Sequence, residues 1–334
     1  MSGVALSLLP DARLPLSTAA ATAAFSTILD GGVDDASIAV FLTAMAERGE
    51  TVDEVTAATQ VLRDRAVTVR APAGAIDVVG TGGDGKHTLN VSTAVAIVVA
   101  ACGVPVAKHG NRAASSRSGA SDVLHELGIA TDVPVATIER GLATLGIAYM
   151  HAANHHAAMA QVATVRRDIG RRTIFNLLGP LLNPAGVQRQ LVGVFDAKWM
   201  LPMAQALAAL GSVRAMVVHG DDGIDELTVT GGSRFVMLDN GRFEEGRVHP
   251  ADAGLATYAP EALTGGAPAD NAAALVALLG GKTGAYRDIV LLNASAALRV
   301  AGLSDDWKAG AALAAHAIDS GAAAALLARW RAFA

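Results

Sequence analysis

The stretch DVVGTGGDGKHTLNVST, residues 77–93, joins an apolar strand to a helix through a loop rich in glycine. Gly80 to Gly85 matches G-x-G-x-x-G, the fingerprint of dinucleotide-binding loops. Gly80 to His87 comes one residue short of G-x-x-x-x-G-K-[ST], the phosphate loop of nucleotide triphosphatases. Because glycine is also the default residue of any tight turn, the loop alone indicates a backbone suited to phosphate and not a particular ligand.

The residues after the next predicted strand argue against both of these nucleotide sites. A dinucleotide site needs an acidic residue about 20 positions further on, but that strand ends at Ala107 and is followed by Lys108 and His109. A triphosphatase loop needs its hydroxyl directly after the lysine, and Thr88 comes one residue late. The run KHGNRAASSRSG, residues 108–119, resembles a second phosphate loop. Two such loops at adjacent strand ends favour a ligand with phosphate at both ends.

A third polar loop supplies carboxylates. AMVVHGDDGIDELT, residues 215–228, is an apolar strand followed by Asp221, Asp222, Asp225 and Glu226. Mg²⁺ binds through one or two carboxylates together with the phosphates of a substrate. The loop is therefore predicted to hold magnesium opposite the phosphate loops, with a solvated acidic turn as the alternative.

The composition excludes several classes of protein. Apolar residues make up 52% of the 334 residues and charged residues 17%, which argues against disorder. The formal net charge of −5 argues against a general nucleic-acid binder. Cys102 is the only cysteine, the N-terminus lacks a basic start, and the longest uncharged apolar run, residues 94–107, is too short to cross a membrane. We expect a cytoplasmic protein with neither a membrane nor a nucleic-acid partner.

The order of predicted elements divides the chain in two. Residues 17 to about 67 have helical periodicity, and Thr51 with Glu54 forms a capping box. Further on, short apolar strands alternate with helices, which indicates a mostly parallel sheet. The strands are predicted at 76–79, 104–107, 191–195 and 215–218. We predict an α/β fold with a small N-terminal all-helical domain (1–70) and a large α/β domain (71–334), whose helical tail at 307–333 covers one face.

Five motifs together resemble the anthranilate phosphoribosyltransferase family of tryptophan biosynthesis. They are GTGGDG (80–85), NVST (90–93), KHGNRAASSRSG (108–119), RTIFNLLGPLLNP (172–184) and GIDE (223–226). The resemblance runs over nearly the whole chain. It implies a homodimer formed through the helical domain, on which residues from about 165 to 185 pack. It also implies transfer of the 5-phosphoribosyl group from phosphoribosyl pyrophosphate (PRPP) to the amine of anthranilate, with release of pyrophosphate.

The resemblance assigns residues to each ligand. For PRPP it implies Gly80, Gly83, Asp84, Thr88, Asn90, Val91, Ser92, Thr93, Lys108, His109, Gly110, Asn111, Arg112, Ala113, Ala114, Ser115 and Ser116. For anthranilate it implies Gly80, Asn111 and Arg166, and along its path His109, His156, Gly179 and Pro180. Mg²⁺, as two ions per subunit, would be held by Ser92, Asp225 and Glu226. The catalytic set implied in this way is Lys108, His109, Asn111 and Arg166.

The chain departs from the family pattern at two places, and three rival functions share parts of it. Ala120 stands where the family usually has serine, and Ala157 follows His156 in place of proline. A pyrimidine nucleoside phosphorylase would carry a loop closer to STGGVGDK. A non-catalytic nucleic-acid-binding relative would have a basic surface and would have lost its magnesium ligands. An NADP-dependent oxidoreductase could use the cation at Lys108.

Overall fold

The centre of the computed structural model, which describes residues 8–112 and 118–333, is a seven-stranded sheet in the order β3-β2-β1-β4-β5-β6-β7. Strands β1 to β5 are parallel to one another, and β6 and β7 are antiparallel to their neighbours. The strands are β1 (Ile76–Gly80), β2 (Val106–Gly110), β3 (Ile147–His151), β4 (Arg189–Gly193), β5 (Arg214–Gly220), β6 (Ser233–Asp239) and β7 (Arg242–Val248). The predicted α/β class with a mostly parallel sheet is confirmed.

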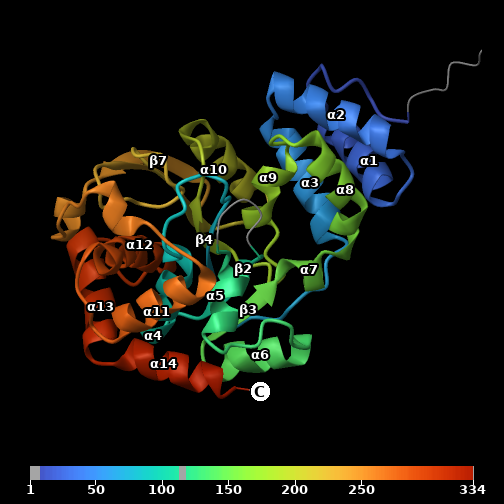
Figure 1. Ribbon diagram of the computed structural model, residues 1–334. Coiled ribbons are helices and arrows are strands. Elements are labelled where there is room, and N and C mark those ends of the chain that lie inside the picture. The colour runs from blue at the N-terminus through green and yellow to red at the C-terminus, as the bar shows by residue number, and fades with distance from the viewer. Residues whose placement is uncertain (1–7, 113–117, 334) are drawn as a thin grey trace, which may run out of the picture.

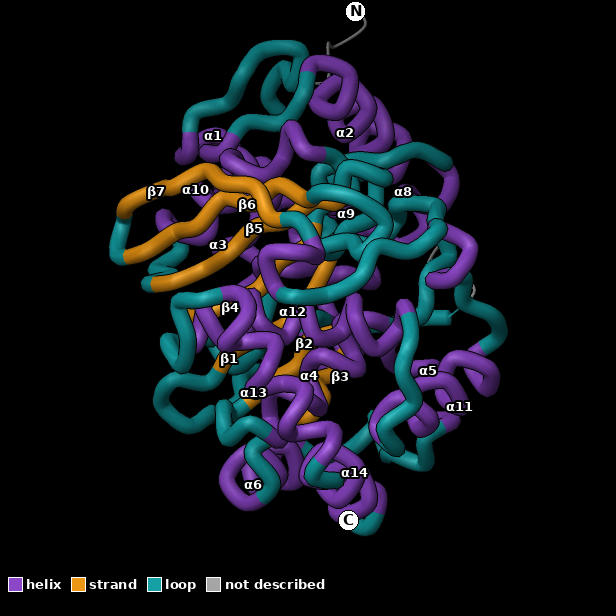
Figure 2. The backbone as a smooth tube through the Cα atoms, turned by 90° about the vertical axis from the view of Figure 1, so that its left-hand side faces the viewer, coloured by secondary structure: helices purple, strands orange, loops and turns teal. Residues whose placement is uncertain are grey.

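Helices cover both faces of the sheet (Figures 1 and 2). Since side chains alternate along a strand, Met216 and Val218 of β5 point to one face, and Ala215 and Val217 point to the other. The first face is covered by α4 (Val91–Ala101), α12 (Ala285–Ala301), α13 (Trp307–Asp319) and α14 (Ala322–Arg331). The second packs on α10 (Met200–Ala209) and on the helical domain. The predicted helical cover at the end of the chain is confirmed by α13 and α14.

The N-terminal domain is a bundle of α1 (Thr18–Leu29), α2 (Asp35–Arg48) and α3 (Val52–Arg63). Two helices from far along the chain, α8 (Ala163–Ile169) and α9 (Phe175–Leu178), lie against it (Figure 1). The ring of Phe25 on α1 contacts Phe41 on α2 and Phe175 on α9 edge-on, at centroid distances of 6.0 and 6.1 Å. The segment that follows the sheet strand β3 is thus part of the core of the helical domain.

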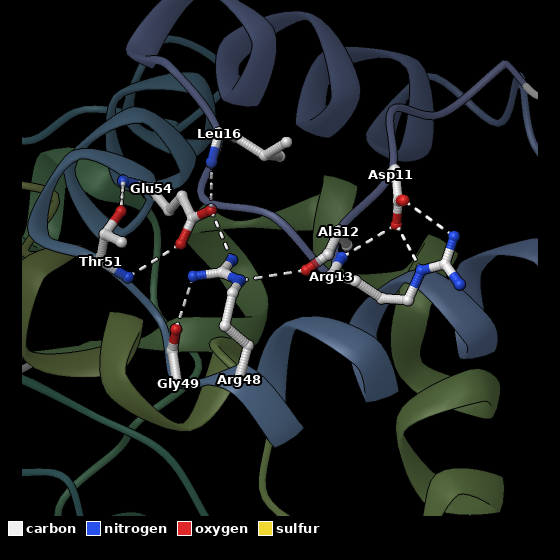
Figure 3. A network of polar contacts seen from close by, with 8 residues as sticks. All are labelled: Asp11, Ala12, Arg13, Leu16, Arg48, Gly49, Thr51 and Glu54. Carbon is white, nitrogen blue, oxygen red and sulfur yellow. Dashed lines mark hydrogen bonds and ion pairs between the residues drawn. The ribbon is translucent and has the colours of Figure 1, made fainter.

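A network of hydrogen bonds at the start of α3 links the segments of this bundle (Figure 3). Thr51 and Glu54 form the predicted capping box. The Glu54 carboxylate, 0% exposed, accepts hydrogen bonds from Thr51 N at 2.8 Å, Leu16 N at 2.9 Å and the Arg48 guanidinium at 2.6 Å. Arg48 also donates to the carbonyl oxygens of Ala12 and Gly49. One buried carboxylate therefore ties the segment before α1 to the junction of α2 and α3.

Three strands, β3, β6 and β7, lie outside the predicted set. β6 and β7 form a hairpin through Asn240 and Gly241, whose φ values of 48° and 81° suit a type I′ turn. The Asn-Gly pair is the sequence signal of this hairpin. In addition, β2 begins two residues later than predicted and continues to Gly110. Lys108 and His109 therefore lie in the strand and not in the loop.

The remaining elements of the described chain range from 3₁₀ turns of three residues to a helix of 12 residues. They are α5 (Ala120–Glu126), α6 (Val135–Thr144), α7 (Ala152–His155), α11 (Pro268–Leu279) and five 3₁₀ turns, η1 (Ala157–Val162), η2 (Gly179–Leu181), η3 (Ala197–Trp199), η4 (Pro250–Ala253) and η5 (Pro260–Leu263). Among the described residues no single helix is both long and apolar enough to cross a bilayer, although α13 and α14 taken together, as a bent pair, meet that requirement by length and composition.

Candidate active site

The glycine loop closes directly onto the acidic loop at the carboxyl edge of the sheet. The Asp225 carboxylate occupies the place that a side chain at Gly80 would take, and the Asp225 backbone does the same at Gly193, so both positions require glycine. Gly82 N donates to Asp225 Oδ2 at 2.7 Å, and Thr81 N donates to Gly193 O at 2.9 Å. The ends of β1 and β4 and the loop after β5 thus meet at one point.

Asp225 and Glu226 place two carboxylates at this point. Both keep some access to solvent but lie deep in the protein. Desolvation raises the pKa of Asp225 to about 7, and the neighbouring Asp84 carboxylate adds to the rise. Desolvation and the charge of Asp225 also raise the pKa of Glu226 well above its usual value, against the effects of Lys108 and of a hydrogen bond from the Ser92 backbone. The pair concentrates negative charge that a cation would stabilise.

The donors around this pair fit a magnesium ion. Ser92 lies in the first turn of α4, where its backbone N–H donates to Glu226 and its hydroxyl accepts from Lys108 Nζ. In the part of the chain that the structure describes, no three histidine, cysteine, aspartate or glutamate side chains form a closed metal site. Two carboxylates with open positions are the ligands that Mg²⁺ uses when substrate phosphates complete its shell.

Lys108 is buried next to Ser92 and Glu226. Its side chain is 2% exposed, and Nζ donates to Val78 O at 2.7 Å and to Ser92 Oγ at 3.3 Å. Desolvation lowers the pKa of Lys108, whereas Asp77 and Glu226 favour its charged form. From this position the ammonium group hydrogen-bonds the Ser92 hydroxyl and stabilises the charged form of Glu226.

The start of α4 presents mainly its backbone to the site. Val91 and Thr93 are 2% and 1% exposed, so their side chains belong to the core. The Asn90 side chain is used in packing, because its Oδ1 accepts hydrogen bonds from Asn271 Nδ2 at 2.8 Å and from Ser118 Oγ at 3.2 Å. In the predicted NVST stretch, the Ser92 hydroxyl and the N–H groups of the helix N-terminus are left to bind a ligand. Such N–H groups favour an anion.

Thr88 closes the far end of the glycine loop. It forms a β-bridge with Thr264, and the backbone on either side is held by Gly265 N to His87 O at 2.8 Å. Thr88 and Thr264 line a cavity of about 230 Å³ together with Lys86 and Glu261. Within the loop, Lys86 N donates to Asp84 Oδ1 at 3.0 Å. Both ends of the loop are therefore anchored in the α/β domain.

The second phosphate loop leaves β2 at the same edge of the sheet. Gly110 faces the ring of Tyr149, and Asn111 and Arg112 are exposed. The other predicted members of this loop, Ala113, Ala114, Ser115 and Ser116, lie outside the described residues. Asn111 Oδ1 accepts a hydrogen bond from Arg112 N at 2.8 Å, which turns the start of the loop.

Ser121 does not replace the hydroxyl that the family has at the position of Ala120. Its side chain is 3% exposed, and its Oγ donates to Thr131 Oγ1 at 3.4 Å. Ser121 is the second residue of α5 and points into the protein, so the departure at Ala120 is left uncompensated.

Two predicted histidines, His109 on β2 and His156 directly after α7, lie together. The rings of His109 and His156 meet edge-on at a centroid distance of 5.3 Å, and both are buried. Desolvation lowers the pKa of His109 to about 3 and that of His156 to about 4, so both rings are neutral at pH 7. The Gly179 backbone borders His109, and Pro180 follows it as a buried residue. The structure brings these four predicted residues into one uncharged wall.

Arg166 is a half-buried cation on α8. Its guanidinium lies 5.4 Å from the centroid of the Phe175 ring, and desolvation lowers its pKa. Among the described residues it forms no salt bridge. A cation held on a ring and left without a carboxylate is suited to bind an acid from solution.

Sequence reasoning missed Asp77, Asn183 and the contacts of Arg172. Asp77, 0% exposed, accepts hydrogen bonds from His109 N at 3.2 Å and from Asn183 Nδ2 at 2.7 Å. Burial raises the pKa of Asp77 to about 6, and Lys108 opposes the rise. The available signal was a carboxylate inside the apolar strand IDVVG. Arg172 donates to Gly83 O, which no local pattern indicates.

Family models match both parts of the chain. Residues 73–324 match the α/β domain of a glycosyl transferase family, and residues 11–66 match the helical bundle domain of a glycosyl transferase family. The fold is that of a two-domain glycosyl transferase.

Relatives along the full chain define the family more closely. The chain is 52% identical over 325 residues to anthranilate phosphoribosyltransferase of Novosphingobium aromaticivorans, covering 97% of this chain and 98% of the relative. It is 56% identical over 314 residues to that of Parvibaculum lavamentivorans, covering 94% and 92%. The crystal structure of anthranilate phosphoribosyltransferase from Thermus thermophilus has a TM-score of 0.91 at 41% identity, covering 97% and 99%. That from Saccharomyces cerevisiae in complex with PRPP and Mg has a TM-score of 0.87 at 27% identity, covering 94% and 92%. The chain belongs to the anthranilate phosphoribosyltransferase family.

Proposed function

We propose that this protein transfers the 5-phosphoribosyl group from PRPP to the amine of anthranilate, giving N-(5-phosphoribosyl)anthranilate and pyrophosphate, as the second step of tryptophan biosynthesis from chorismate. The observation that carries the proposal is the contact of Asp225 with the glycine loop, beside Glu226, Ser92 and Lys108. A loop of backbone N–H groups binds phosphate oxygens, and the carboxylates bind the cation that accompanies them. Membership of the family supports anthranilate as the acceptor.

The proposed magnesium ligands are Ser92, Asp225 and Glu226, for two ions per subunit. The yeast relative was solved in complex with PRPP and Mg, which supports this assignment. Bound there, Mg²⁺ would neutralise the negative charge that develops on departing pyrophosphate. Lys108 acts by holding Ser92 and Glu226 in place.

The proposed PRPP site is formed by three pieces of backbone. They are the glycine loop with Gly80, Gly83, Asp84 and Thr88, the start of α4 from Asn90 to Thr93, and the segment from Lys108 to Ser116, which begins at the end of β2. Phosphate at each end of PRPP requires donors on both sides of the ribose, and the glycine loop and the second loop leave adjacent strands. This arrangement fits PRPP better than a dinucleotide, which would require an acidic residue at Lys108.

The proposed acceptor site lies between Arg166, Asn111 and the wall of His109, His156, Gly179 and Pro180. Arg166 would pair with the carboxylate of anthranilate. An aromatic amine is neutral at pH 7, so its attack needs no prior deprotonation, and His109 with a pKa of about 3 is a weak base. The protein then acts by positioning the amine and stabilising an oxocarbenium-like transition state, with inversion at the anomeric carbon.

We assign dimerisation to the helical domain, residues 1–70, and PRPP binding to residues 71–334, in a cytoplasmic homodimer. Residues from about 165 to 185 are assigned to the packing between the domains, since Val165 and Phe175 share a core with α1 to α3. Val40 on α2 is 71% exposed and lines a groove of about 660 Å³ between α2 and α8. Exposed apolar surface of this kind is typical of a protein interface.

The test is the fluorescence of anthranilate followed with PRPP and Mg²⁺. We expect the signal to fall with time and to stay constant when PRPP is left out. Thymidine with phosphate, given to the same enzyme, should produce no thymine. A folded protein that leaves anthranilate unchanged would refute the proposal, and release of thymine would favour a nucleoside phosphorylase.

Arg166→Ala sharpens this test. We expect the KM for anthranilate to rise by about 100-fold, because a charge-assisted bidentate pair is lost. The KM for PRPP should change little. Arg167→Ala is the matched control, since Arg167 is the next residue of α8 and is exposed. Equal effects of the two substitutions would contradict the role of Arg166.

A further inference from the structure

Arg172 makes two contacts that join it to the glycine loop. Its guanidinium donates to Gly83 O, and it lies 4.0 Å from the centroid of the Phe195 ring. Phe195 N in turn donates to Thr81 Oγ1 at 3.0 Å. Arg172 therefore reaches the loop directly at Gly83 and indirectly, through Phe195, at Thr81.

The Gly83 contact lies where two consecutive glycines of the loop have positive φ values. Gly82 and Gly83 have φ values of 64° and 73°, in the region where glycine tolerates several peptide orientations. Gly82 N is held by Asp225, and Lys86 N is held by Asp84. The peptide between Gly83 and Asp84 has its carbonyl held by Arg172. Since this peptide is trans, fixing the carbonyl toward Arg172 turns the Asp84 N–H to the opposite side.

The neighbouring arginine points in another direction. α8 ends at Ile169 with Gly170 as its C-cap, and Arg171 forms an ion pair with Glu47 on α2 at 3.1 Å. Two consecutive arginines thus bind the helical domain and the glycine loop, respectively. Helix α8, which carries Arg166, is therefore connected to the glycine loop through Arg171 and Arg172.

We propose that Arg172 is a positioning residue that sets the glycine loop in the conformation that binds the pyrophosphate of PRPP. This inference rests on the proposed function for the identity of the ligand. By holding the Gly83 carbonyl, Arg172 presents the Asp84 N–H to the phosphate oxygens. The stacked Phe195 keeps the planar guanidinium at the distance and angle that this hydrogen bond needs.

The experiment compares Arg172→Ala with Arg171→Ala, two exposed neighbouring arginines. For Arg172→Ala we expect the KM for PRPP to rise about tenfold, which corresponds to about 1.4 kcal/mol. The KM for anthranilate at saturating PRPP should stay within about twofold, as the Arg166 side chain is untouched. Arg171→Ala should leave both KM values within about twofold. Equal KM values for PRPP in the two variants, or a loss confined to kcat, would overturn the proposal.

A conservative variant separates positioning from charge. Arg172→Lys keeps the positive charge but loses the planar group that stacks on Phe195. We expect it to restore less than half of the lost PRPP affinity. Full rescue by lysine would show that charge alone is needed and would overturn the positioning role.

A binding measurement keeps the inference separate from the proposed function. Calorimetric titration with magnesium pyrophosphate tests the loop without any acceptor. Weaker binding to Arg172→Ala than to Arg171→Ala would support the positioning role even if anthranilate were not the acceptor. Equal binding to both variants would overturn the positioning role even if the wild type consumed anthranilate.

Discussion

Glu54 in the helical domain and the Asp225–Glu226 pair in the candidate active site are carboxylates in opposite situations. The Glu54 carboxylate is buried and accepts hydrogen bonds from two backbone N–H groups and from Arg48. Asp225 and Glu226 keep some access to solvent, repel each other, and have raised pKa values. The first arrangement holds two chain segments together. The second concentrates negative charge that a bound cation would stabilise.

The comparison predicts its largest effect at Glu226. Glu226→Gln removes a proposed Mg²⁺ ligand, and we expect kcat/KM to fall by about 100-fold or more. The melting temperature without Mg²⁺ should stay the same or rise, because repulsion with Asp225 is removed. The anthranilate fluorescence assay and a thermal melt check the two halves of this prediction.

Asp221→Asn is the control for Glu226→Gln. Asp221 lies in the same loop but pairs with Arg234 and Arg247, so its loss should leave activity within about twofold. If Glu226→Gln kept wild-type activity, or lowered the melting temperature by several degrees, the contrast with Glu54 would not hold.

At Glu54 we expect the reverse of Glu226→Gln, a loss of stability without a loss of activity. Glu54→Ala leaves the Arg48 guanidinium, whose side chain is 15% exposed, without its partner, and we expect a loss of about 3 kcal/mol in the free energy of unfolding. The measurement is the urea unfolding curve, with kcat per folded molecule unchanged. Asp53→Ala, at an exposed position in the same helical turn, should cost about 0.5 kcal/mol. Equal losses at the two positions would show that the buried network does not stabilise the bundle.

The two regions also differ in how far the sequence predicts them. The capping box at Thr51 depends on residues three positions apart, so it was predicted in full. The motifs of the cleft placed the glycine loop and Asp225 at strand ends, because loops that follow parallel strands gather at one edge. The charges that oppose the desolvation of Lys108 are not predictable from its sequence neighbours, since Asp77 and Glu226 come from other elements. Contacts of exposed side chains such as Arg172 depend on tertiary packing that leaves no periodic signal.

The comparison extends to the buried His156, where we expect a smaller effect, namely a dependence of protein stability on pH. Desolvation lowers the pKa of His156 from 6.5 to about 4, and one ring nitrogen has no hydrogen-bond partner among the described residues. Between those two pH values the unfolded chain binds more protons than the folded chain. The contribution of neutral His156 to stability is therefore complete above pH 6.5 and is lost as the pH falls toward 4.

His156→Gln should remove this dependence, which amounts to about 3 kcal/mol at most. We expect the difference in unfolding free energy between wild type and variant to shrink from pH 7 to pH 4, measured by urea unfolding at each pH. His125→Gln, at an exposed position of α5, is the matched control and should leave the slope of the wild type unchanged. A parallel pH dependence in wild type and His156→Gln would mean that His156 is protonated as readily in the folded protein as in the unfolded chain. In that case the wall beside His109 carries charge at acidic pH, and an acceptor that carries a carboxylate would bind there more tightly as the pH falls.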